Sequence, residues 1–259
     1  MPDIRYAQNE NVDRGDLRMQ VIERGTSTPI DDAKISISYS GDPDSTVEEV
    51  NTDASGMSET LTLDTPPLEL SMQPSEVQPY AEYTIQVTAK GYRPINISGI
   101  EVFSGQLSLQ EIRMDAEEAT ESMTDNIVIP AHTLFAEYPP KIAEAEIKPV
   151  TETGEIVLSR VVIPEYVIVH DGAPSDPTAR DYYIRYRDYI KNVASSEIYS
   201  TWPDATIRAN VLAIMSFTLN RVYTEWYRNK GYSFTITSST AYDQKFMYGR
   251  NIYQSISDV

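Results

Sequence analysis

The sequence contains no cysteine and only two histidines, His132 and His170. The absence of cysteine excludes disulfide bonds, thiolate nucleophiles and every Cys-based metal site. The two histidines lie in separate regions, with no partner spacing for a metal ion or for a nucleophilic triad, so we expect each to be a structural or a surface residue. These residue types therefore indicate no metal site.

Long apolar runs are also missing. No stretch of about 18 apolar residues exists, so we expect no membrane span. The first ten residues are polar and lack the apolar core of a secretory signal, so we expect no classical export signal here. With 41% hydrophobic and 23% charged residues the composition is that of a globular protein, and 259 residues are enough for two domains.

Basic residues are scarce: 21 Lys and Arg stand against 39 Asp and Glu, a net charge of −18. Nucleic acid is therefore not an expected partner, because phosphate binding needs a basic surface. Residues 1–150 carry 27 acidic and 10 basic residues, and residues 151–259 carry 12 and 11. Tyrosine is more frequent in the second half, with 6 in residues 1–150 and 12 in residues 151–259. A tyrosine-rich, nearly neutral second half suits a site that stacks on sugar rings, although tyrosine is equally ordinary core material.

After an N-terminal tail (1–14), residues 15–114 predict a β-sandwich. Four segments alternate apolar and polar residues with a period of two, and turn sequences separate them. The segments are 17–22, 34–39, 83–88 and 107–112. We expect an antiparallel sandwich. The order of its parts, including the turn Thr52-Asp-Ala-Ser-Gly56 and the strand end Lys90-Gly-Tyr92, resembles the transthyretin-like or carboxypeptidase-regulatory sandwich, which implies a non-catalytic scaffold.

Residues 115–155 have the composition of an acidic linker, with a stiff break at Tyr138-Pro-Pro-Lys141. They are either a solvated connection or an exposed segment open to a protease. From residue 156 onward we expect a mixed α/β domain (156–259). Its predicted strands are 156–163, 166–169 and 233–237, and residues 180–199 are expected to be mostly helical. The clearest helix begins at Pro203, with Thr201 as its cap, and ends at Lys230-Gly231.

Glu197 lies in the run Asn192-Val-Ala-Ser-Ser-Glu-Ile-Tyr-Ser-Thr-Trp-Pro203, just before this helix. Its small neighbours leave room for a bulky substrate, and Tyr199 and Trp202 offer flat surfaces for sugar rings. By spacing alone a glutamate at such a position is usually a solvated capping residue.

The run from Tyr189 to Asn210 resembles the signature of the SpoIID/LytB family: Tyr-(Ile/Leu)-x-x-Val-(Val/Ala)-x-Ser-Glu, then Trp-Pro, then a helix. Residues 221–232, 235–244 and 248–250 are similar to the cortex-lytic members of this family from clostridial spores, as are the segments 169–172 and 174–176. The resemblance covers residues 156–259 closely and the first half more loosely.

The resemblance implies a peptidoglycan lytic transglycosylase that degrades the spore cortex during germination, located in the cortex and coat region outside the spore core. It implies a zymogen that a subtilisin-like Csp protease activates within residues 115–155, no cofactor, and a domain that continues past residue 259. The family's catalytic glutamate falls on Glu197. Substrate-binding positions are expected at Tyr199, Trp202, Arg208, Thr240, Tyr242 and Gln244.

Two departures from the family pattern stand out. Met215 occupies a position where many relatives carry arginine, and Arg221 is a candidate substitute. The cysteine zinc ligands of the SpoIID proteins are absent, so no metal is expected.

One carboxyl is enough for the implied reaction. A lytic transglycosylase protonates the glycosidic oxygen with an acid, and the same group then deprotonates the muramic acid 6-hydroxyl, which closes a 1,6-anhydro ring. Two alternatives stay open: a non-enzymatic protein that binds peptidoglycan or shapes the spore, and a glycosidase that hydrolyses the same bond. The acidic first half is either a solvated face or a shield that keeps the second half inactive.

Overall fold

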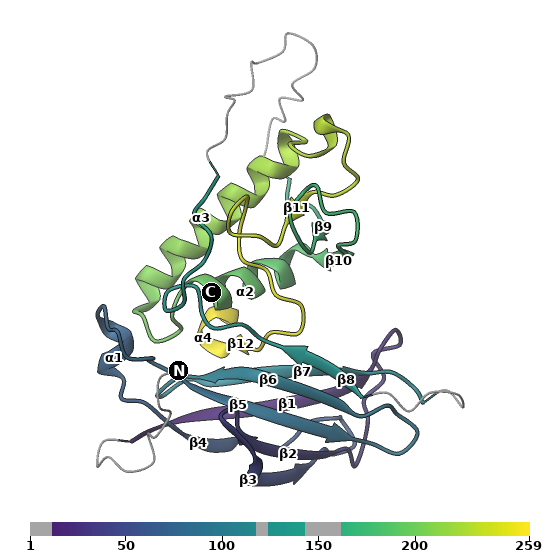
Figure 1. Ribbon diagram of the computed structural model, residues 1–259, viewed down its shortest axis with the longest axis vertical. Coiled ribbons are helices and arrows are strands. Elements are labelled where there is room, and N and C mark those ends of the chain that lie inside the picture. The colour runs from purple at the N-terminus through teal and green to yellow at the C-terminus, as the bar shows by residue number, and fades with distance from the viewer. Residues whose placement is uncertain (1–11, 118–123, 143–161) are drawn as a thin grey trace.

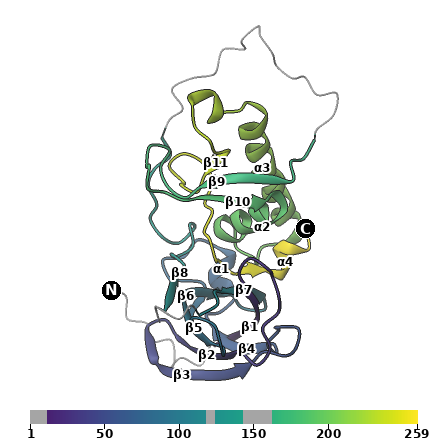
Figure 2. The same ribbon diagram turned by 90° about the vertical axis from the view of Figure 1, so that its right-hand side faces the viewer.

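The computed structural model describes residues 12–117, 124–142 and 162–259. These residues form a mixed α+β structure with two parts. A β-sandwich lies at one end, and a smaller unit of helices and short strands stands on it (Figures 1 and 2). Within these ranges no helix is long and apolar enough to cross a membrane.

Two sheets make the sandwich. One has the order β3-β2-β5-β6-β8 and the other β12-β7-β1-β4. Their bounds are β1 (Asp13–Glu23), β2 (Lys34–Tyr39), β3 (Asp42–Asn51), β4 (Leu61–Thr65), β5 (Ala81–Thr88), β6 (Ile95–Val102), β7 (Leu107–Met114), β8 (Asp125–Val128) and β12 (Ile252–Tyr253), with the short helix α1 (Glu69–Met72) after β4.

The period-two pattern explains the sandwich core. In β1 the side chains of Leu17, Met19 and Val21 are fully buried while their neighbours face outward, and Ile35 and Ile37 of β2 do the same from the opposite sheet. All four predicted strand segments are confirmed. The sandwich is not wholly antiparallel as expected, because β7 pairs with β1 and β8 with β6 in parallel. Each of these pairs joins segments separated by a long connection, which is what parallel pairing requires.

The smaller unit contains a three-stranded sheet of order β10-β9-β11 and two main helices. Its elements are β9 (Tyr166–His170), β10 (Asp181–Arg185), α2 (Tyr186–Glu197), α3 (Asp204–Tyr223), η1 (Arg228–Lys230), β11 (Ile236–Thr237) and α4 (Gln254–Ser257). The strand predicted at 166–169 is confirmed, and the one at 233–237 shrinks to two residues. Most of the strand predicted at 156–163 lies outside the described residues.

The segment 180–199 is mostly helical as predicted, since α2 covers 186–197, although residues 181–185 form an edge strand that pairs with β9. The prediction for the long helix needed two corrections. The long helix ends at Tyr223, seven residues early, and Gly231 with φ 89° instead caps the 3-10 turn η1. The residue before α3 is Pro203, with no side-chain cap, and the hydroxyl of Thr201 is buried without a hydrogen-bond partner.

A second core, separate from the sandwich core, is shared by the two parts. Tyr80 and Phe103 of the sandwich pack with buried side chains of α2, α3 and the C-terminal segment, and Phe103 contacts both Tyr199 and Tyr253 at ring distances of 5.3 and 5.4 Å. Strand β12 adds to the sandwich beside β7. Just before β12, Gly249 lies against Ile127 of β8: its φ is 83°, and a Cβ there would press on the Ile127 side chain at 3.1 Å.

Candidate active site

Glu197 is the last residue of α2. The helix stops there because Ile198 adopts extended backbone angles. One turn earlier Asn192 fixes the helix to the returning chain: its side-chain amide donates to the carbonyl of Met247 at 2.8 Å and accepts from the Met247 amide at 2.9 Å. The glutamate is therefore held on a rigid element against residues 244–247.

The Glu197 carboxyl is largely removed from water, although the residue keeps part of its surface. The Lys245 backbone N–H donates to Oε1 at 2.6 Å. Burial raises the pKa of Glu197 to about 6, against the opposing effects of that N–H and of the nearby Lys141 cation. Near neutral pH such a carboxyl exchanges a proton readily, which is the requirement for an acid that later acts as a base.

Two buried polar residues hold the loop that carries Lys245. Gln244 accepts hydrogen bonds from Tyr189 of α2 and Thr218 of α3 at 3.3 and 2.8 Å. Asp243 is fully buried and paired with Arg221 at 2.7 Å. It also accepts bonds from the Tyr227 hydroxyl and from both the amide and hydroxyl of Thr237. Because every one of these partners is inside the protein, Asp243 is committed to structure.

The segment after β8 runs past Glu197. Thr133 donates to the carbonyl of Ser196 through its hydroxyl at 2.8 Å, and the amide of Ile142 donates to Ala241 at 2.7 Å. Between them the Lys245 ammonium lies 5.3 Å from the ring of Tyr138. The ammonium of Lys141 donates to the carbonyl of Asp243 at 3.1 Å. Residues 133–142 therefore bind both the end of α2 and the loop beside the candidate acid, and we call them the strap.

The six predicted substrate-binding positions differ in how far they are exposed to solvent. Tyr199 is buried against Phe103 and His132, and Gln244 is buried between α2 and α3, so both serve packing in this arrangement. Trp202 is half-buried, and its indole N–H donates to the carbonyl of Ser71. Exposed or partly exposed positions remain at Arg208 on α3 and at Thr240 and Tyr242 in the loop. A role in substrate binding stays a prediction for all six.

Neither the strap nor Lys245 was predictable as part of the site from the sequence. Tyr138-Pro-Pro-Lys141 looked like linker, and only the folded chain brings it beside Glu197. Arg221, the suggested substitute for a catalytic arginine, is buried in its pair with Asp243. His170 is structural as expected: its ring stacks on Phe234 at 4.3 Å, and Nδ1 lies 2.7 Å from Asp181.

No protein-family model matches this sequence, and no curated protein matches it. Among solved structures the chain is similar to the Bacillus anthracis TIE protein, at 15% identity over 40% of this chain and 17% of that chain, with a TM-score of 0.28. It is also similar to Klebsiella pneumoniae 5-hydroxyisourate hydrolase, at 17% identity over 40% of this chain and 92% of that chain, with a TM-score of 0.26. A third similar structure is Acinetobacter radioresistens catechol 1,2 dioxygenase, at 13% identity over 46% of this chain and 58% of that chain, with a TM-score of 0.27. Likenesses this weak carry no argument about what the chain does.

Proposed function

We propose that this protein is the zymogen of a peptidoglycan lytic transglycosylase of the SpoIID/LytB type, close to the cortex-lytic enzyme SleC, with Glu197 as its acid and base. The observation that carries the proposal is a desolvated carboxyl with a pKa of about 6 at the position of the family's catalytic glutamate. The sandwich would then be a transthyretin-like scaffold beside a SpoIID-type catalytic domain.

In the proposed reaction the protonated Glu197 donates its proton to the oxygen of the MurNAc–GlcNAc β-1,4 bond as that bond breaks. The resulting carboxylate then accepts the proton of the muramic acid 6-hydroxyl, whose oxygen bonds to C1. The only other carboxylate of this loop, Asp243, is neutralised by Arg221, which argues against a second carboxylate that activates water.

The strap supports the zymogen part of the proposal. It binds on both sides of Glu197, so a glycan strand that reaches the carboxyl has to displace it or pass beside it. Cleavage by a subtilisin-like Csp protease within 115–155 would free the strap at one end. Much of that stretch, 118–123 and 143–155, lies outside the described residues. The spore cortex as location and substrate remains part of this proposal.

The test is the mass of the products. Purified spore cortex is digested with the protein before and after limited proteolysis, and the muropeptides are weighed. Ends that lack one water, as 1,6-anhydro muramic acid does, support the proposal. Fully reducing ends would show a hydrolase instead.

The pH profile of the reaction is a separate prediction. The first step needs the protonated form of Glu197, so kcat/KM should fall about tenfold per pH unit above the pKa of about 6. Because the Lys141 cation lowers that pKa, Lys141→Met should move the falling limb to higher pH. The exposed Lys90→Met serves as the control and should leave it in place. A rate that is constant between pH 5.5 and 8 contradicts the assignment.

A further inference from the structure

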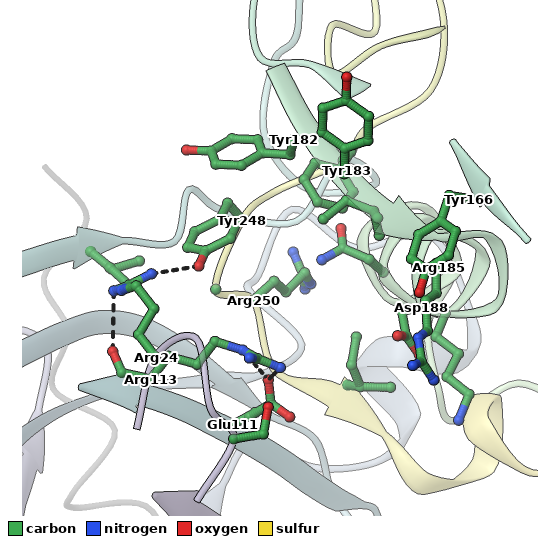
Figure 3. A pocket seen from close by; sticks show the side chains of 18 of the residues that line it. Arg24, Glu111, Arg113, Tyr166, Tyr182, Tyr183, Arg185, Asp188, Tyr248 and Arg250 are labelled. Carbon is green, nitrogen blue, oxygen red and sulfur yellow. Dashed lines mark hydrogen bonds and ion pairs between the residues drawn. The ribbon is translucent and has the colours of Figure 1, made fainter. Parts of the chain in front are cut away.

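A large crevice lies between the sandwich and the smaller unit. Its volume is about 780 Å³, and its lining comes from β7, β10, the first turns of α2 and the segment 246–252 (Figure 3). Glu197 is not among the lining residues. Crevices of this size hold a ligand as large as a short oligosaccharide.

Tyrosine rings line this crevice, and two of them are exposed to solvent. Tyr183 on the edge strand β10 is 73% exposed and Tyr166 on β9 is 45% exposed. Tyr182 and Tyr248 stack on each other at 4.6 Å, and Arg24 of the sandwich donates to the Tyr248 hydroxyl at 2.6 Å. The stacked pair thus forms a fixed wall. The ring of Tyr183 is exposed, and the ring of Tyr166 is partly exposed beside the Arg185 guanidinium, so both offer ring surface that suits the apolar face of a sugar.

The charge of the lining is opposite to that of the chain. Five basic side chains line the crevice against two acidic ones, although the protein has a net charge of −18. Three of the five are paired: Arg24 with Asp115, Arg113 with Glu111, and Arg250 with Glu101. Arg185 and Lys191 have no carboxylate partner within ion-pair distance among the described residues; the ammonium of Lys191 donates to the Ser257 hydroxyl.

Arg185 stands next to both exposed rings. It pairs in register with Tyr166 across the β10–β9 ladder, its guanidinium lies 6.0 Å from the centre of that ring, and it shares a strand face with Tyr183 two residues earlier. Figure 3 shows Tyr166, Arg185 and Asp188 together on one side of the crevice, opposite Tyr248 and Arg24. Rings and an accessible cation therefore lie within reach of one ligand.

We propose that this crevice is a binding site for a glycan that carries carboxylate groups, with sugar rings on Tyr183 and Tyr166 and carboxylates at Arg185 and Lys191. Such a site would hold a strand beside the protein without taking part in its chemistry. It does not depend on Glu197, so the protein can bind here even if it cuts no glycan.

The test measures binding by calorimetry at low salt in the full chain that carries Glu197→Gln, so that no probe is consumed. The probe is a GlcNAc–MurNAc tetrasaccharide with free lactyl carboxylates. Tyr183→Ala and Arg185→Gln should each weaken binding about tenfold. Reducing the carboxyls to alcohols should weaken binding to the parent chain, and should weaken it less in Arg185→Gln, where Lys191 alone is left to bind a carboxylate.

Two matched controls lie elsewhere on the surface. Tyr223→Ala removes an exposed tyrosine at the end of α3, and Arg14→Gln removes an exposed arginine that pairs with Asp64 on the sandwich. Both controls should bind the probe as tightly as the parent does. The two crevice variants and the two controls should all unfold at the same midpoint as the parent. Equal binding by Tyr183→Ala and Arg185→Gln overturns the proposal. The proposal is also overturned if the parent binds the carboxyl-reduced probe as tightly as the original probe. It is overturned as well if a tetraglutamate peptide binds as tightly as the probe and is weakened by the same two substitutions.

Discussion

Glu197→Gln is expected to lower the rate of glycan cleavage by at least about 1,000-fold while the protein stays folded. The glutamine amide oxygen keeps the acceptor for the Lys245 N–H, so the local structure should persist. It has no proton to donate to the glycosidic oxygen and no carboxylate to accept one. The rate is measured as release of soluble muropeptides from cortex after limited proteolysis.

The same variant tests whether the ionised Glu197 carboxyl lowers the stability of the fold. A pKa of about 6 in place of 4.5 means that folding disfavours the ionised carboxyl by about 2 kcal/mol at pH 7.5. The folded pKa is raised, so this penalty is absent below the unfolded pKa and complete above the folded one. Glu197→Gln should therefore unfold at the same or a higher temperature than the parent at pH 7.5, with no such gain at pH 4.

Glu137→Gln, the same change at an exposed position of the strap, is the matched control and should cleave at the parental rate. If Glu197→Gln cleaves as fast as this control, Glu197 is not the acid. If the parent binds glycan and never cleaves it, the non-enzymatic alternative is correct. Binding that survives in Glu197→Gln while cleavage disappears supports the enzyme.

Glu101→Gln is expected to lower the free energy of unfolding by about 3–5 kcal/mol. Glu101 on β6 and Arg250 in the C-terminal segment form an ion pair that is almost wholly buried, and the Tyr253 hydroxyl also donates to Glu101 at 3.0 Å. Removing the carboxylate leaves the Arg250 charge buried without its partner, at the place where the two parts of the molecule meet. Denaturant unfolding followed by tyrosine fluorescence measures the loss.

The control for this prediction is Glu49→Gln on β3, whose ion pair with Lys34 is half exposed on both sides. Exposed pairs contribute little, so its unfolding midpoint should match that of the parent. Since Phe103 and Tyr80 pack into the same core, Glu101→Gln should destabilise both parts in one transition. Two separate transitions in the parent protein would contradict this view of a shared core.

The sandwich strands were predictable because their signal is local. A strand that buries one face alternates along its own sequence, as Leu17, Met19 and Val21 do, and no knowledge of the partner strand is needed. Parallel pairing of β1 with β7 has no such signal, because it depends on how the intervening chain wraps. The same limit explains the helix error at 181–185, where an aromatic and charged run became an edge strand once β9 was beside it.

The candidate site divides in a similar way. Glu197 was found through the motif around it, and its residue type was enough to name its chemistry. Its pKa was not readable, because that value results from burial against the 243–247 loop and from Lys141, which comes from a stretch that reads as linker. Tyr199 and Gln244 were expected to bind substrate, and whether their polar groups face a ligand or a neighbour is decided by packing across α2, α3 and the sandwich.

By itself the sequence determined the strand-rich first half, the lack of cysteine chemistry, the acidic surface and the one glutamate that matches a catalytic motif, because each of these depends on residue type and short spacing. Only the tertiary structure decided that the strap lies beside Glu197, that Glu101 and Arg250 join the two parts, and that basic and tyrosine side chains gather in one crevice. Those features bring together residues up to 224 positions apart in the chain, and no local pattern encodes contacts over that distance.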